Sequence, residues 1–181
     1  MSDRIAVVQM HGEPGSGKST LARALAPRIG AVVLDKDIIK SALLRSGAPE
    51  SLAASGAYEA YFDLARSLVE QRRSIILDNP VFWARVEEQW LALSAAAGCA
   101  PILIECVCPD RDELVRRLGS RNGLESNPRE PLDLLRHPGS VETRFEPRIT
   151  LDTTRPLARL VDEATRFVEA RVSVNRVGVA P

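Results

Sequence analysis

The sequence predicts a three-layer α/β fold in which a doubly wound, five-stranded parallel sheet lies between two layers of helices. Short apolar runs rich in β-branched residues alternate with longer stretches of helical spacing, which is typical of consecutive βαβ units. A glycine-rich segment joins the first predicted strand to the first predicted helix, as in phosphate-binding loops. The 181 residues suffice for a single domain with a sizeable core. We expect that domain to span residues 1–172, followed by a flexible tail at 173–181.

The predicted strands are short apolar runs, and they cover residues 5–10, 31–34, 74–78, 101–108 and 148–154. The predicted helices cover residues 19–30, 38–45, 51–72, 80–97, 110–121 and 156–172, and the spacing also allows a short helix at 131–136. Leu21 and Leu25 mark the buried face of the first helix. Gly98 is a stop signal for the fourth helix, and Asp110 is a capping residue for the fifth.

Aromatic side chains gather on the third predicted helix, where Tyr58, Tyr61 and Phe62 lie at helical spacing. Packing in the core is the favoured interpretation. A wall of an acceptor pocket is the alternative, because this helix lies between the second and third strands.

The segment from His11 to Thr20 contains the pattern G-x-x-x-x-G-K-[ST]. Its glycines let successive backbone N–H groups point at one anion, and Lys18 can reach the β- and γ-phosphates of a nucleotide. The Ser19 hydroxyl can ligate Mg²⁺. The residues expected to contact the nucleotide are Gly12, Glu13, Pro14, Gly15, Ser16, Gly17, Lys18, Ser19 and Thr20. An ordinary glycine-rich turn is the alternative, but the strand before the loop and the helix after it favour nucleoside triphosphate binding.

Acidic residues end two of the predicted strands. Asp37 follows the second strand, where it could act as general base toward an attacking hydroxyl or simply cap the next helix. Asp78 ends the third strand, where it could position Mg²⁺ or start a turn. Asp35 is a further candidate for the outer shell of the metal. Asn79 occupies the position at which motor ATPases often carry a catalytic Glu, which argues against an energy-transducing ATPase.

An Arg-rich lid is predicted at about residues 121–147, in a segment rich in Pro and Gly. Its guanidinium groups could close over a triphosphate and neutralise charge on the transferred group. Arg117 and Arg121 are four residues apart and favour this role, with Arg136 or Arg144 as further candidates. For Arg111 and Arg116 we favour a solvated helix face.

The composition sets limits on partners and compartment. Lys plus Arg and Asp plus Glu each number 24, so the formal net charge is zero and gives no general attraction to nucleic acid or to a membrane. Three cysteines, an odd number, fit a reducing compartment, and a cytoplasmic location is expected. Cys106 and Cys108 are interpreted as core thiols in preference to half of a metal site.

Together these features resemble small P-loop kinases of the nucleoside-kinase-like group, which includes zeta toxins, chloramphenicol phosphotransferase and polynucleotide kinase-like, AAA-type ATP-binding proteins. The resemblance covers Ile5 to about Val172. The phosphate loop followed by Asp35-Lys36-Asp37-Ile38-Ile39-Lys40 is similar to the loop and the Asp-x-Asp-x-x-Lys segment of zeta toxins. The second Asp of that segment is the base in the family, which implies this role for Asp37.

Two further segments resemble the family. Arg117-Leu118-Gly119-Ser120-Arg121 is similar to the R-L-x-x-R at the start of the family's lid. Leu151-Asp152-Thr153 is similar to the turn that borders the adenine, which implies contacts of Asp152 and Thr153 with the nucleotide.

The resemblance implies an ATP- and Mg²⁺-dependent phosphotransferase that acts on a hydroxyl of a small molecule such as a sugar, an antibiotic or a nucleoside-like metabolite. A polynucleotide 5′-hydroxyl kinase is the alternative among enzymes, although Lys40 replaces the family's Arg and the zero net charge disfavours a nucleic-acid acceptor. An ATP-binding switch is the alternative from another class of protein.

Overall fold

The computed structural model describes residues 5–79, 84–120, 124 and 145–174. Its centre is a single sheet of five strands in the order β2-β3-β1-β4-β5, and every neighbouring pair is parallel. The strands are β1 (Val7–His11), β2 (Ala31–Asp35), β3 (Ser74–Asp78), β4 (Ile102–Val107) and β5 (Arg148–Asp152). All five predicted strands are present, so the predicted parallel α/β sheet is confirmed.

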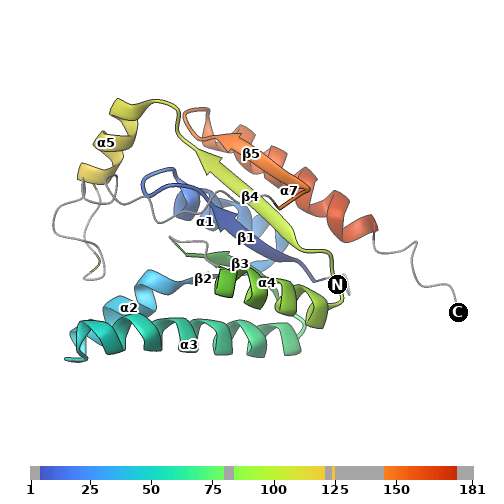
Figure 1. Ribbon diagram of the computed structural model, residues 1–181. Coiled ribbons are helices and arrows are strands. Elements are labelled where there is room, and N and C mark those ends of the chain that lie inside the picture. The colour runs from blue at the N-terminus through green and yellow to red at the C-terminus, as the bar shows by residue number, and fades with distance from the viewer. Residues whose placement is uncertain (1–4, 80–83, 121–123, 125–144, 175–181) are drawn as a thin grey trace, which may run out of the picture.

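Helices cover both faces of this sheet (Figure 1). They are α1 (Lys18–Ile29), α2 (Lys36–Arg45), α3 (Glu50–Glu70), α4 (Ala84–Ala97), α5 (Arg111–Gly119) and α7 (Leu157–Val174). One hydrophobic core joins α1 and α7 to the sheet, and a second core joins α3 and α4 to the opposite face. Ile76 of β3 belongs to the first core while its neighbours Ile75 and Leu77 belong to the second, because successive side chains of a strand point to opposite faces.

The order of the strands fixes where a ligand can bind. The adjacent strands β1 and β3 are followed by helices on opposite faces of the sheet, α1 on one and α4 on the other. A crevice opens between such strands at their carboxyl ends, which is where open α/β sheets bind ligands. In Figure 1 this edge lies between α5 above and α2 below.

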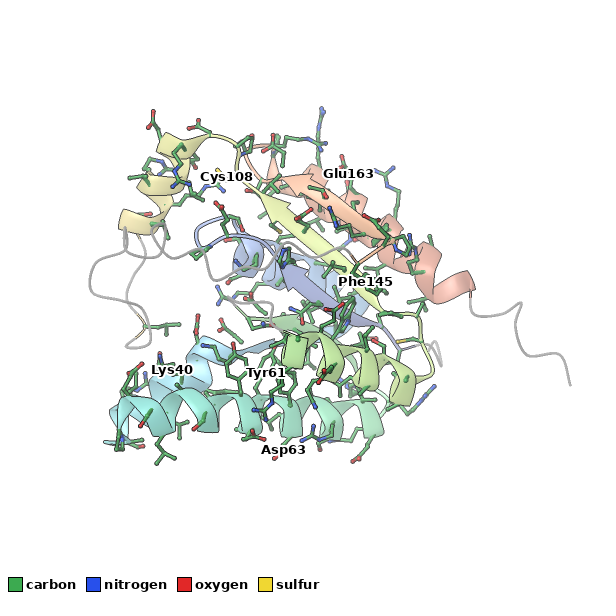
Figure 2. All side chains as sticks on the ribbon, viewed as in Figure 1. Lys40, Tyr61, Asp63, Cys108, Phe145 and Glu163 are labelled. Atoms are coloured by element: carbon green, nitrogen blue, oxygen red, sulfur yellow. The ribbon has the colours of Figure 1, made fainter. Side chains whose placement is uncertain are left out.

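Several side chains singled out in the sequence lie in the cores. Tyr61 and Phe62 are fully buried, which agrees with their interpretation as core residues, whereas Tyr58 is half-buried. Figure 2 labels Tyr61 on α3. Cys106 is buried, and Cys108 is only partly buried with its Sγ 3.3 Å from the carbonyl oxygen of Asp110.

Some predictions lie outside the described residues: the short helix at 131–136, nearly all of the lid, most of the tail, and Arg121, Arg136 and Arg144. Within the part of the chain that the structure describes, no helix is both long enough and apolar enough to cross a membrane.

Candidate active site

The glycine-rich loop turns sharply between β1 and α1. Gly12 has φ 131° and Gly17 has φ 90°, which side-chain-bearing residues rarely adopt. A Cβ on Gly12 would lie 2.1 Å from the carbonyl oxygen of Cys106, so only glycine fits there. The predicted nucleotide contacts Gly12, Glu13, Pro14, Gly15, Ser16, Gly17, Lys18, Ser19 and Thr20 form this loop and the first turn of α1. The positive end of the α1 dipole therefore points into the loop, where an anion would be stabilised.

Lys18 folds back over this loop. Its side chain is buried, and its Nζ donates to the carbonyl oxygens of Gly12 at 2.7 Å and Glu13 at 2.8 Å. These carbonyl contacts hold the ammonium at the mouth of the loop, where a phosphate can replace them as its partners.

Ser19 and Asp78 meet across the crevice. The Ser19 side chain donates a hydrogen bond to the Asp78 carboxylate, whose Oδ2 is buried and has no hydrogen-bond partner among the described residues. Burial raises the pKa of Asp78, and the hydrogen bond from Ser19 partly opposes that shift. A buried carboxylate oxygen without a partner, beside a hydroxyl, fits a hard cation with its water ligands. Among the described residues there is no group of three or more His, Cys, Asp or Glu that could hold a metal ion.

Asp35 lies beside Asp78, because the two residues are paired in the β2–β3 register. Its Oδ1 accepts from the backbone N–H of Asp37 at 3.0 Å, and its Oδ2 accepts from Arg23 at 3.0 Å. Asp35 is therefore the N-cap of α2, the role that sequence reasoning weighed for Asp37. Both oxygens of Asp35 are engaged, which makes Asp78 the better candidate for the metal shell.

Asp37 lies in the first turn of α2 and is free of the capping role. Its Oδ1 is 2.6 Å from Nζ of Lys36, a residue that the sequence analysis left without a role. Burial first, and the charge of Asp37 second, raise the pKa of Tyr58 of α3 to about 12. Asp37 thus lies at the carboxyl edge of the sheet with Lys18, Ser19 and Asp78.

Arg117 and Thr153 connect α5 to the phosphate loop. The guanidinium of Arg117 donates to the hydroxyl and the carbonyl oxygen of Thr153, both at 2.9 Å. The Thr153 hydroxyl donates in turn to the carbonyl oxygen of Ser16 at 2.8 Å. Asp152 accepts hydrogen bonds from Thr154 and shapes the same turn. The structure therefore brings Arg117, Asp152 and Thr153 together beside the loop.

Glu113 is a second residue that sequence reasoning missed. It accepts from Nε of Arg117 at 2.7 Å and also binds Arg116. Hydrogen bonds from Arg116 and then Arg117 lower the pKa of Glu113 to about 2. The four-residue spacing of Glu113 and Arg117 was the signal that could have found it. Arg111 and Arg116 are largely exposed, as expected for a solvated face.

Comparison with protein families gives a match to the AAA domain model AAA_33 over residues 7–136, more than half of the chain. Uncharacterized protein Rv2004c of Mycobacterium tuberculosis and Mb2027c of Mycobacterium bovis are each 27% identical over 166 residues, covering 84% of this chain and 32% of theirs. The chain thus spans about a third of the length of these curated relatives.

Solved structures share the fold. A candidate kinase from Chloroflexus aurantiacus aligns with TM-score 0.72 and 24% identity over 93% of this chain and 98% of its own. A gluconokinase from Sinorhizobium meliloti aligns with TM-score 0.64 and 18% identity over 97% of both chains. The Mycobacterium tuberculosis APS kinase CysC, in complex with AMPPNP and APS, aligns with TM-score 0.63 and 20% identity over 92% of this chain and 98% of its own. The chain has the fold of small P-loop kinases.

Proposed function

From the premise that this chain belongs to the AAA domain family, we propose that it is an ATP-dependent kinase that transfers the γ-phosphoryl group to a hydroxyl of a small molecule. One observation carries the proposal. The phosphate loop, the buried Asp78 oxygen beside Ser19, and the Asp37 carboxylate all lie at one edge of the sheet. Donor, metal and acceptor groups are needed together for phosphoryl transfer, and this edge supplies residues for each.

Each residue has a defined task in this proposal. Lys18 and the loop N–H groups bind the β- and γ-phosphates, and Ser19 with Asp78 would hold Mg²⁺. Bound Mg²⁺ neutralises charge on the phosphates. Asp37 accepts the proton of the acceptor hydroxyl or orients that hydroxyl for in-line attack. Arg117 and the turn at Asp152 and Thr153 border the nucleotide.

The neighbours with the same fold support the choice of donor and acceptor. These neighbours include a sugar kinase, a gluconokinase and an APS kinase bound to AMPPNP, an ATP analogue. All three are kinases of small molecules. The three free cysteines of this chain support a reducing, cytoplasmic compartment.

The test is a transfer assay with γ-labelled ATP and Mg²⁺ against separate pools of sugars, sugar acids, nucleosides, antibiotics and oligonucleotides. We expect label to move to one small-molecule pool. The variant D37N should retain ATP binding and lose transfer by about 10²–10⁴-fold, because general-base catalysis contributes that much. The matched control D63N removes an exposed carboxylate of α3 and should retain full activity.

Two results would contradict the proposal. Label released only as inorganic phosphate with every pool would favour an ATP-binding switch, and label on oligonucleotides alone would favour a polynucleotide kinase. Full activity of D37N would exclude Asp37 from the reaction.

A further inference from the structure

Lys36 is placed where its charge has a physical cost. It is the first residue of α2 and only 7% exposed. Lysine is almost never fully buried unless it is paired. The N-terminus of a helix also carries partial positive charge and disfavours a cation. Stability of the helix therefore does not account for a lysine at this position.

The contacts of Lys36 are directed at Asp37. Its Nζ is 2.6 Å from Oδ1 of Asp37 and 5.4 Å from the centroid of the Tyr58 ring. The second distance is in the range of a cation–π interaction. The Lys36 ammonium therefore links the Asp37 carboxylate in the first turn of α2 to the Tyr58 ring of α3.

The Tyr58 ring belongs to a packed surface. It stacks on Phe62 with ring centroids 6.2 Å apart, and Phe62 is 3% exposed in the core against the sheet. An ammonium held against such a ring cannot move freely. Since it also contacts Oδ1 of Asp37, it restricts the rotation of that carboxylate.

We propose that Lys36 is a positioning residue: its ammonium, held over the Tyr58 ring, fixes the Asp37 carboxylate and so presents it to the acceptor hydroxyl. This inference rests on the proposed function, because it assumes that Asp37 contacts the acceptor. Phosphoryl transfer depends on alignment of the reacting atoms, and an error of about 1 Å can cost on the order of a hundredfold in rate. An ion pair between neighbouring residues, with one partner buried, supplies that alignment.

The experiment compares K36M, K36R and D37N, together with the double variant K36M/D37N. K36M should lower kcat for transfer by on the order of ten- to a hundredfold. It should leave the Kd for ATP within about twofold, because the partners of Lys36 among the described residues are Asp37 and Tyr58, which lie outside the glycine-rich loop. K36R should restore part of kcat. In the D37N background K36M should have no further effect, because Lys36 acts through Asp37. The control R28M removes an exposed cation of α1 and should behave as wild type.

A second measurement needs no acceptor. The denaturant midpoints of the wild type, K36M, D37N and K36M/D37N form a double-mutant cycle that reports whether Lys36 and Asp37 interact. Non-additive midpoints support the pair, and additive midpoints overturn it. Two kinetic results overturn the positioning role. One is a kcat of K36M equal to that of the wild type. The other is a loss of kcat from D37N to K36M/D37N as large as the loss from the wild type to K36M. If the wild-type protein transfers no phosphoryl group at all, the proposed function fails and the positioning role fails with it, while the midpoint cycle still reports on the ion pair.

Discussion

At the scale of single residues, the site depends on positions that admit one type of side chain. Gly12 combines a φ of 131° with a carbonyl oxygen of Cys106 where its Cβ would be. Asp78 keeps one carboxylate oxygen buried and without a partner among the described residues. An unsatisfied buried oxygen costs about 1–3 kcal/mol, and this cost supports the proposal that Asp78 helps to hold Mg²⁺.

Gly12→Ala should lower the free energy of unfolding by at least about 2 kcal/mol, because backbone strain and overpacking each cost about 1–3 kcal/mol. Gly30→Ala is the matched control. Gly30 also has positive φ, 64°, but nothing lies within 4 Å of its Cβ position, so the cost should be about 1–2 kcal/mol. Chemical denaturation measures both values. Equal destabilisation of the two variants would show that the Cys106 contact is unimportant.

At the scale of elements, α5 and the turn after β5 support the loop between β1 and α1. Thr153 and Arg117 are 36 residues apart in the chain, and Thr153 and Ser16 are 137 apart, yet their hydrogen bonds join all three segments. The side chains of Leu114 and Leu118 of α5 also lie against Gly15. The loop is therefore held by its neighbours before any nucleotide arrives.

Thr153→Val keeps the shape of the side chain and removes the hydroxyl that links Arg117 to Ser16. We expect the Kd for ATP to rise by roughly three- to tenfold, because one hydrogen bond contributes about 0.5–1.5 kcal/mol. Arg117→Met should weaken ATP binding at least as much. The control Arg116→Met changes an exposed neighbour on α5 and should leave the Kd unchanged. Isothermal titration calorimetry measures the Kd for ATP of each variant. An unchanged Kd in Thr153→Val would rule out support of the loop through Thr153.

At the scale of the whole molecule, the central strand carries polar groups into the interior of the fold. Gln9 and His11 of β1 are buried between the two helical layers. Burial lowers the pKa of His11, although the charge of Glu105 on the neighbouring strand opposes that shift. Between the lowered pKa and the ordinary value of 6.5, the unfolded chain binds a proton that the folded protein does not bind.

The free energy of unfolding should therefore decrease as the pH falls through and below about 6.5. Above that pH His11 is neutral in both the folded and the unfolded chain, so its contribution to stability no longer changes with pH. His11→Asn removes the titrating group and should flatten this part of the profile. Urea unfolding of both proteins between about pH 8 and pH 5 measures the difference, since the carboxylates that titrate in this range are common to both. Parallel profiles would show that His11 does not contribute.

The sequence by itself determined what local spacing encodes. Alternating apolar runs and helical stretches predicted five parallel strands with helices between them. A strand that is buried on both faces is a continuous apolar run, and such a run can be recognised within each short segment. The loop from Gly12 to Ser19 could be predicted from the sequence for the same reason, since its turn and its predicted phosphate-binding residues lie within eight consecutive positions.

Only the tertiary structure decided how separate segments meet. It made Asp35 the helix cap bound to Arg23, placed the Lys36 ammonium on Asp37 and over the Tyr58 ring, and joined Arg117 to Thr153. These roles depend on packing of α2 on α3 and of α5 beside the loop. The spacing of residues along the chain does not predict such contacts, because burial and side-chain pairing arise only when distant elements pack together.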